Sequence, residues 1–136
     1  MANALYPKTK KRFMAGDIDL TAVAVYAALI NVSGAGTTYA YSATHASLTD
    51  VPFGAIIATS PALTGKALGD DASFDSDDPV LPVVTGQSIE ALILYADDGI
   101  GTYLIMYQDS GVTGLPLTPD GSDVQVLVDA AGWFLL

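Results

Sequence analysis

Hydrophobic positions along the chain form one helical pattern at the start and, beyond it, short apolar runs of the length of β-strands. Residues 3–15 (NALYPKTKKRFMA) predict this helix, because Leu5 and Phe13 recur on one face at helical spacing. Asn3 is suited to cap the start of the helix, and Gly16 is suited to end it. The segment therefore predicts a short amphipathic helix whose polar side carries most of the basic residues of the chain.

Beyond Gly16 the apolar runs are short, rich in β-branched residues and bounded by Gly, Pro and Asp turn signals. The segments predicted to be extended are 23–30, 55–63, 80–84, 88–95, 102–108, 123–128 and 133–136. About seven strands with turns every ten or so residues predict an all-β, single-domain β-sandwich or barrel with a short N-terminal helix. We assign residues 1–16 to a basic helix or arm and residues 17–136 to the β domain.

Two of these strands, 88–95 and 102–108, are apolar on both faces. In the second strand, strict alternation places Leu104 and Met106 on the face opposite Ile105. Strands that are apolar on both faces are covered on both faces. The second cover must come from the N-terminal helix, a loop or another subunit.

Composition adds an argument for assembly. Hydrophobic residues make up 51% of the chain and charged residues only 15%, whereas soluble domains have about 25% charged residues. This thin polar surface predicts a homo-oligomer. No apolar run approaches the roughly 20 residues of a membrane span, so we expect no membrane partner.

Charge is distributed very unevenly between the start of the chain and the rest. The net charge is −10, and four of the five basic residues are Lys8, Lys10, Lys11 and Arg12. Without those four positive charges the net charge becomes −14. A body this acidic repels phosphate, so we expect no nucleic-acid partner.

Residues suited to catalysis or metal binding are sparse. The only histidine is His45, which has Asp50 nearby but no serine elbow of the G-x-S-x-G type, so we predict that the protein is not an enzyme. Five aspartates between positions 70 and 78 lack the ordered spacing of a calcium loop and favour a solvated loop. There is no complete phosphate-binding motif and no cysteine. We therefore predict no catalytic, cofactor-binding or metal-binding residues.

The basic cluster predicts protein contacts, because its charge is opposite to that of the body and apolar residues lie beside it. We expect this segment to bind an acidic protein surface. The candidate protein-interaction residues are Leu5, Tyr6, Lys8, Lys10, Lys11, Arg12, Phe13 and Met14.

Several stretches, taken together, resemble a group of small virion proteins of tailed bacteriophages. They are MANALYPKTKKRFMAGDID, TDVPFGAIIATSPALTGKAL, FDSDDP, EALILYADDG, LIMYQDSG and GLPLTPDGSDVQV. Their order and coverage carry the resemblance, since no single stretch is a strong motif. One departure is the first strand, LTAVAVYAALI, which is rich in alanine and nearly all apolar where relatives alternate polar and apolar residues.

The resemblance implies a non-enzymatic virion structural protein, made in the host cytoplasm and carried on the particle. It is most consistent with a capsid decoration (cement) protein that binds the major capsid protein or other virion proteins on the head surface and bridges capsid subunits. Alternatives are a tail, neck or baseplate component, or a receptor- or carbohydrate-binding fibre module. For the fibre module, exposed tyrosines in 37–42 would suit stacking on sugars.

Overall fold

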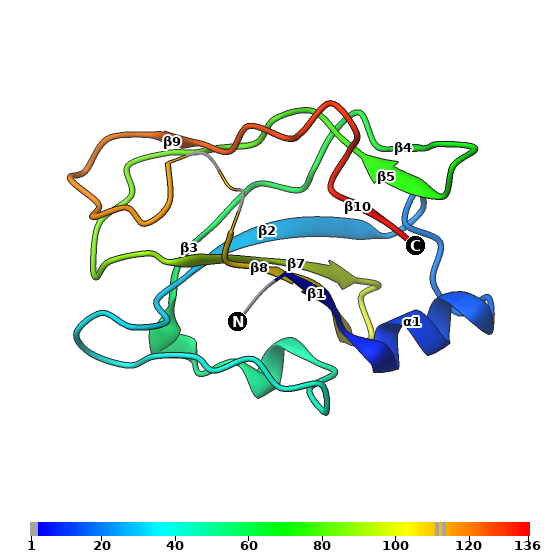
Figure 1. Cartoon of the computed structure of the whole chain (residues 1–136), viewed down its shortest axis with the longest axis horizontal. Helices are drawn as coiled ribbons and strands as arrows, with labels where there is room; N and C mark the ends of the chain where they lie inside the picture. The colour runs from blue at the N-terminus through cyan, green and yellow to red at the C-terminus, as the bar shows by residue number, and fades with distance from the viewer. Residues whose placement is uncertain (1–2, 111, 113) are drawn as a thin grey trace.

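A five-stranded antiparallel sheet forms the centre of the computed structural model, which describes residues 3–110, 112 and 114–136 (Figure 1). Residues 1 and 2 of the predicted arm lie outside the described residues. The strand order is β1-β8-β7-β2-β3. The bounds are β1 Ala4–Leu5, β2 Ala24–Ile30, β3 Ile56–Thr59, β7 Ala91–Asp97 and β8 Thr102–Gln108. The predicted hairpin of two long apolar strands is therefore the β7–β8 pair.

Two small antiparallel sheets lie over one face of the central sheet, here called the upper face (Figure 1). One has the order β10-β5-β4 and the other pairs β6 with β9. Their bounds are β4 Ala67–Leu68, β5 Ser73–Asp75, β6 Val80–Leu81, β9 Val124–Gln125 and β10 Phe134–Leu135. The strands β6, β9 and β10 are shorter than the predicted segments 80–84, 123–128 and 133–136; β6, for example, stops before Pro82, which has no N–H to continue a ladder. The strands β4 and β5 were not predicted, and β5 lies within the predicted acidic loop. The prediction of a β-rich chain with a helix at its start is confirmed, and the described strands close no barrel.

The lower face is covered by the loop 31–55, which contains two 3-10 turns, η1 (Leu48–Asp50) and η2 (Phe53–Ala55) (Figure 1). Along β2, Val25 and Leu29 pack in the upper cluster, whereas Ala28 and Ile30 pack in the lower cluster. The chain thus supplies both covers of its central sheet. The sequence left three candidates for the cover of the second sheet face: the N-terminal helix, a loop or another subunit. The loop 31–55 supplies most of this cover, so the two strands that are apolar on both faces do not require another subunit.

The register of β8 differs from strict alternation. Leu104 packs in the lower cluster, whereas Ile105 and Met106 both pack in the upper cluster. The pairing passes from Tyr95↔Leu104 to Leu94↔Met106 and leaves Ile105 without a partner. This is a β-bulge, which adds one residue to one strand. The prediction that Leu104 and Met106 share a face was therefore wrong.

The helix α1 spans Pro7–Met14, with Pro7 in its first turn, and is shorter than predicted. Asn3 does not cap it, because the chain first forms β1, and its side chain instead binds the backbone of Asp109 and Ser110. Gly16 ends the helix as predicted, with φ of 74°. Its N–H donates to the Phe13 carbonyl, and the next N–H donates to the Arg12 carbonyl, which is a Schellman motif.

Candidate functional site

The inner side of α1 is fixed to the body of its own chain. The Tyr6 N–H donates to the Ile105 carbonyl at 3.0 Å. The hydroxyl of Thr9, which is 1% exposed, donates to the Leu104 carbonyl. The helix thus uses the carbonyls at the β-bulge of β8, and it is held in one orientation rather than forming a free arm.

The Tyr6 side chain extends this attachment into the lower layer. Its hydroxyl hydrogen-bonds that of Tyr39 at 2.8 Å, and the Tyr39 hydroxyl hydrogen-bonds His45 Nδ1 at 2.7 Å. Burial raises the pKa of Tyr6 well above its usual value and also raises the pKa of Tyr39. The neutral phenols therefore join the N-terminal segment to the loop 31–55.

Asp50 also has a structural position in this layer. Its Oδ2 accepts hydrogen bonds from the N–H groups of Ala46 and Ser47, at 2.7 and 3.1 Å, and these bonds lower the pKa of the carboxyl group. Since His45 Nδ1 is bonded to Tyr39, both residues that could have belonged to a catalytic triad hold the lower layer together.

The outer side of α1 presents the basic cluster to solvent. Lys8, Lys10, Lys11 and Arg12 are exposed, and Met14 is 82% exposed. The Arg12 guanidinium lies 4.6 Å from the centre of the Tyr103 ring, a cation–π distance that orients this one cation. Beside it, a hollow of about 410 Å³ is lined by Lys8, Lys11, Arg12, Ala15, Asp17 and Ala46.

The eight predicted interaction residues thus fall into two groups. Tyr6 is fully buried in the lower cluster, and Leu5 and Phe13 are half-buried against the upper cluster. These three hold the helix in place on its own chain. The five exposed residues, four of them basic and the fifth Met14, present most of the accessible surface of this set.

An apolar groove of about 510 Å³ opens at the C-terminal end of α1. It lies between the end of the helix, the segment leading to β2 and the β10-β5-β4 sheet, at the right of Figure 1. Its apolar lining is Phe13, Ile18, Leu20, Leu68, Phe74, Phe134 and Leu136. The sequence alone does not reveal the groove, because its walls come from three distant segments, each of which contributes too few residues to form a pattern. The partial signal was the apolar Phe13–Met14 pair directly after the basic residues.

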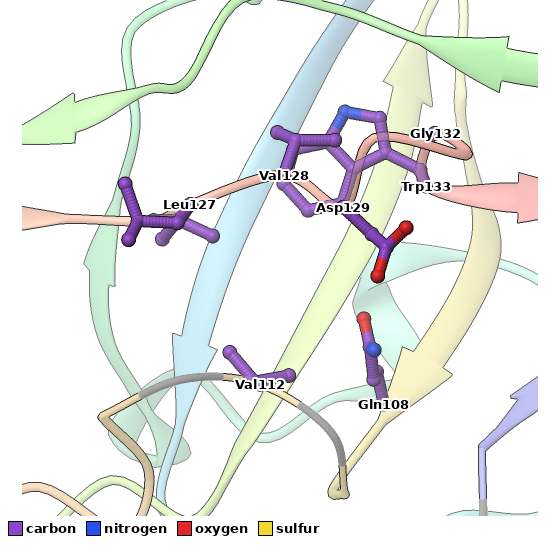
Figure 2. Close-up of a pocket in the computed structure, with 8 residues that line it drawn as sticks. Gln108, Val112, Leu127, Val128, Asp129, Gly132 and Trp133 are labelled. Carbon is purple, nitrogen blue, oxygen red and sulfur yellow. The ribbon is translucent and has the colours of Figure 1, made fainter.

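A second pocket, shown in Figure 2, lies between the end of β8 and the segment before β10. The side chains of Gln108 and Asp129 point toward one another there, beside Val128 and Trp133 (Figure 2). Its volume of about 210 Å³ is below the roughly 300–1,000 Å³ of small-molecule sites. The Trp133 ring is only 8% exposed and its Nε1–H donates to Ser76 Oγ, so this tryptophan serves the core.

The tyrosines expected to be exposed in 37–42 do not form a sugar-stacking surface. Tyr39 is 2% exposed and Tyr41 is half-buried. The Tyr41 ring lies 5.0 Å from that of Tyr6 and 5.4 Å from that of Tyr107, measured between ring centres. The expectation of exposure was wrong for Tyr39, because this part of the loop supplies aromatic cover for the central sheet.

The acidic loop is held by local hydrogen bonds. Asp71 accepts from the Ser73 N–H, Asp75 from the Ser76 N–H and Asp78 from the Val128 N–H. In the part of the chain that the structure describes, no three residues of the types that bind metals are grouped as a site. Helix α1, at eight residues, is far too short to cross a membrane, and no other described helix is long and apolar enough.

Comparisons with known proteins leave the family open. No protein-family model matches the chain, and no curated protein is significantly similar to it.

Proposed function

We propose that this protein is a non-enzymatic structural component of a tailed-bacteriophage virion, and specifically a capsid decoration protein. In this function it binds the major capsid protein on the outer head surface and bridges capsid subunits. The proposal rests on the resemblance of the ordered sequence stretches from MANALYPKTKKRF to GLPLTPDGSDVQV. The structural observation that supports it most is the fixed helix α1, with exposed cations on one side and an apolar groove at its end.

This arrangement suits binding to a surface better than it suits turnover of a substrate. The inner side of α1 is held by the Tyr6 N–H and the Thr9 hydroxyl, so the backbone that carries the cations does not have to be ordered on binding. The groove is apolar and contains few polar groups that converge on a bound molecule. We infer a homo-oligomer on the virion, with no nucleic-acid, membrane or cofactor partner.

We further propose that the chain is an irregular sandwich rather than a barrel. The central sheet would be one layer, and the two small sheets over its upper face would together form the other (Figure 1). Counting the short pairs β4–β5 and β6–β9 as parts of one layer supports this proposal. In that arrangement α1 lies at one end of the sandwich, with its basic side exposed.

Quantitative mass spectrometry of purified virions tests the proposed function. A decoration protein is expected at a copy number comparable with that of the major capsid protein. A tail, neck, baseplate or fibre protein would be present in few copies, and its detection at that level would contradict the decoration role. Absence from purified particles would exclude all of these structural roles together.

Adding the purified protein back to particles that lack it tests the surface. Reversal of charge at the exposed lysines, as in the double variant Lys10→Glu/Lys11→Glu, is expected to weaken binding by an amount that shrinks at high salt. Exposed ion pairs contribute roughly 0–1 kcal/mol each, and salt screens them. Lys66→Gln is a control for a lysine outside α1. If the double variant and the unmodified protein bind the particles equally well, the basic cluster does not contribute to attachment.

A further inference from the structure

Met14 is an exposed apolar side chain at the end of a helix whose exposed side is otherwise basic. It is 82% exposed and does not line the adjacent groove, although the preceding Phe13 does. Lys10 and Lys11 lie four and three residues before it, so they are its neighbours on the helix surface. The end of α1 is therefore an apolar tip accompanied by two cations.

The groove beside it has the opposite charge at its rim. Asp19 lines the groove, and Ala72, another lining residue, follows directly after the exposed Asp70 and Asp71. An occupant that matches this groove has an apolar tip flanked by cations. In the described residues that combination occurs on α1, since the only basic residue outside it, Lys66, donates to the Val23 carbonyl.

We propose that a second copy of this chain occupies the groove, in a two-fold dimer in which Met14 of each copy enters the groove of the other. Lys10 and Lys11 of each copy then face Asp19, Asp70 and Asp71 of the other. A two-fold interface pairs the same patch with itself, which requires that one patch contain both halves of each contact. The patch around the end of α1 meets this requirement, because the apolar tip at Met14, the two lysines, the groove and its acidic rim all lie there.

Charge explains why the second copy approaches in this orientation. Outside residues 1–12 the chain has a net charge of −14, so most pairs of surfaces on two copies repel one another. Pairing each basic helix with an acidic rim gives attraction at two places in the dimer. Burial of Met14 supplies the apolar contribution, and the charges determine orientation and salt dependence. This proposal deepens the proposed function, because it specifies the homo-oligomer inferred there.

Sedimentation velocity across a concentration series tests the apolar half of the contact. The full chain is expected to dimerise, and Met14→Ala is expected to raise the dissociation constant about tenfold for each of the two side chains, or about a hundredfold for the dimer. Ile100→Ala is the matched control, because Ile100 is 95% exposed at the turn between β7 and β8. A monomer at all concentrations would overturn the proposal, as would a dimer that Met14→Ala leaves unchanged.

An exchange of charges tests the orientation. Lys10→Glu/Lys11→Glu is expected to abolish self-association, and so is Asp70→Lys/Asp71→Asn, in which asparagine keeps an oxygen for the Ser73 N–H. A mixture of the two variants is expected to form a heterodimer, because one contact then keeps the original lysines against the original aspartates and the other pairs the introduced glutamates with the introduced lysine. Lys8→Glu, compared with Lys10→Glu alone, controls for net charge. Failure of the mixture to associate, while each variant remains folded by circular dichroism, would overturn the two-fold arrangement.

The oligomeric state in solution and the copy number in purified virions together distinguish the dimer from the proposed function. A protein that is monomeric in solution but abundant in purified virions would retain the structural role and lose the dimer. A protein that dimerises through Met14 but is absent from virions would retain the dimer and lose the structural role.

Discussion

The two faces of the central sheet are covered in different ways. Six of the seven tyrosines pack in the lower cluster, and the remaining one, Tyr103, lies at the margin of the upper cluster. The lower cover is one continuous loop, 31–55, in which the Tyr39 hydroxyl hydrogen-bonds that of Tyr6 and the Asp50 carboxylate accepts from the Ala46 N–H. The upper cluster is mainly aliphatic and is covered by short strands joined by irregular segments.

Backbone conformation shows the same difference. Among the described residues, the non-glycine residues with positive φ are Ala72 at 66° and Val83 at 49°, and both belong to the upper layer. In the lower loop the one positive φ belongs to Gly36, and hydrogen bonds run along the loop: Asn31 donates to the Ala35 carbonyl and accepts from the Gly34 N–H, and Glu90 accepts from the Val32 N–H. Directional hydrogen bonds thus determine the lower cover, whereas non-directional apolar burial tolerates irregular backbone in the upper one. Helix α1 is attached to the lower layer through the preceding Tyr6, to β8 through Thr9 and to the upper cluster through Phe13.

Alkaline pH is expected to have the largest effect on the difference between the two layers, because it ionises the buried tyrosines of the lower layer. Burial raises the pKa of Tyr107 to about 12 and raises the pKa of Tyr6 and Tyr39. A raised pKa in the folded state means that these phenols contribute full stability below the unfolded-state pKa of about 10 and lose it as pH rises toward 12. Circular dichroism and tyrosinate absorbance should therefore show unfolding in this window, with hydrogen exchange rising first in the loop 31–55. Titration of all tyrosines near pH 10 with the fold intact would contradict the role assigned to the lower layer.

Tyr6→Ala is expected to have the next largest effect. Loss of a buried aromatic ring costs about 3–5 kcal/mol of unfolding free energy, and Leu94→Ala in the upper cluster should cost about 2–5 kcal/mol. The two differ in place: Tyr6→Ala should also loosen α1 and the loop 31–55, whereas Leu94→Ala should leave both protected. Urea unfolding with residue-level hydrogen exchange measures both quantities. Equal protection of α1 in the two variants would show that the lower layer does not anchor the helix.

Tyr39→Phe isolates the hydrogen bonds from the packing. It keeps the ring but leaves the fully buried Tyr6 hydroxyl without its partner, at a cost of about 1–3 kcal/mol. Tyr41→Phe, in the same ring cluster but half-buried, is the control and should change stability by less than about 0.5 kcal/mol. Adding Tyr6→Phe to Tyr39→Phe should recover part of the loss, because the unpaired hydroxyl is removed. No recovery in denaturant midpoint would argue against the Tyr6–Tyr39 pair.

The difference between the layers also explains what the sequence could predict. The strands 88–95 and 102–108 were recognisable because central strands carry long apolar runs, and the structure confirms them as β7 and β8. The bulge at Ile105 was not recognisable, because it depends on carbonyls that bind Tyr6 and Thr9 about a hundred residues away. Strand lengths in the upper layer were overestimated, because apolar residues there are buried by packing although their backbone does not continue the hydrogen-bond ladder of a strand.

The candidate site was predicted in part. The predicted polar side of the helix carries the four basic residues, and the structure confirms that they are exposed. The exposure of Met14 was not predicted. The inward position of Tyr6 depends on β1, which forms in place of the first predicted turn of the helix. The strand β1 exists only because it pairs with β8, and this tertiary contact cannot be predicted from the local sequence. The groove likewise required the fold, because Phe13, Phe74 and Phe134 meet only after the small sheets are in place. The contact of these residues with an acidic protein surface stays a prediction.

The smallest expected effect lies in the upper layer and has the opposite sign. Val83 is a β-branched residue in the left-handed region and is 68% exposed, and its N–H donates to Asp123 Oδ1 at 3.0 Å. Glycine relieves about 1–2 kcal/mol of steric cost there and loses about 0.5–1 kcal/mol through the entropy of the unfolded chain. Val83→Gly should therefore raise the free energy of unfolding by about 0.5–1 kcal/mol in urea titrations. Val80→Gly, at an exposed position within β6, is the matched control and should lower it by about 1 kcal/mol. If both glycines destabilise the protein equally, the left-handed backbone at Val83 is not strained, and the two layers differ in packing chemistry alone.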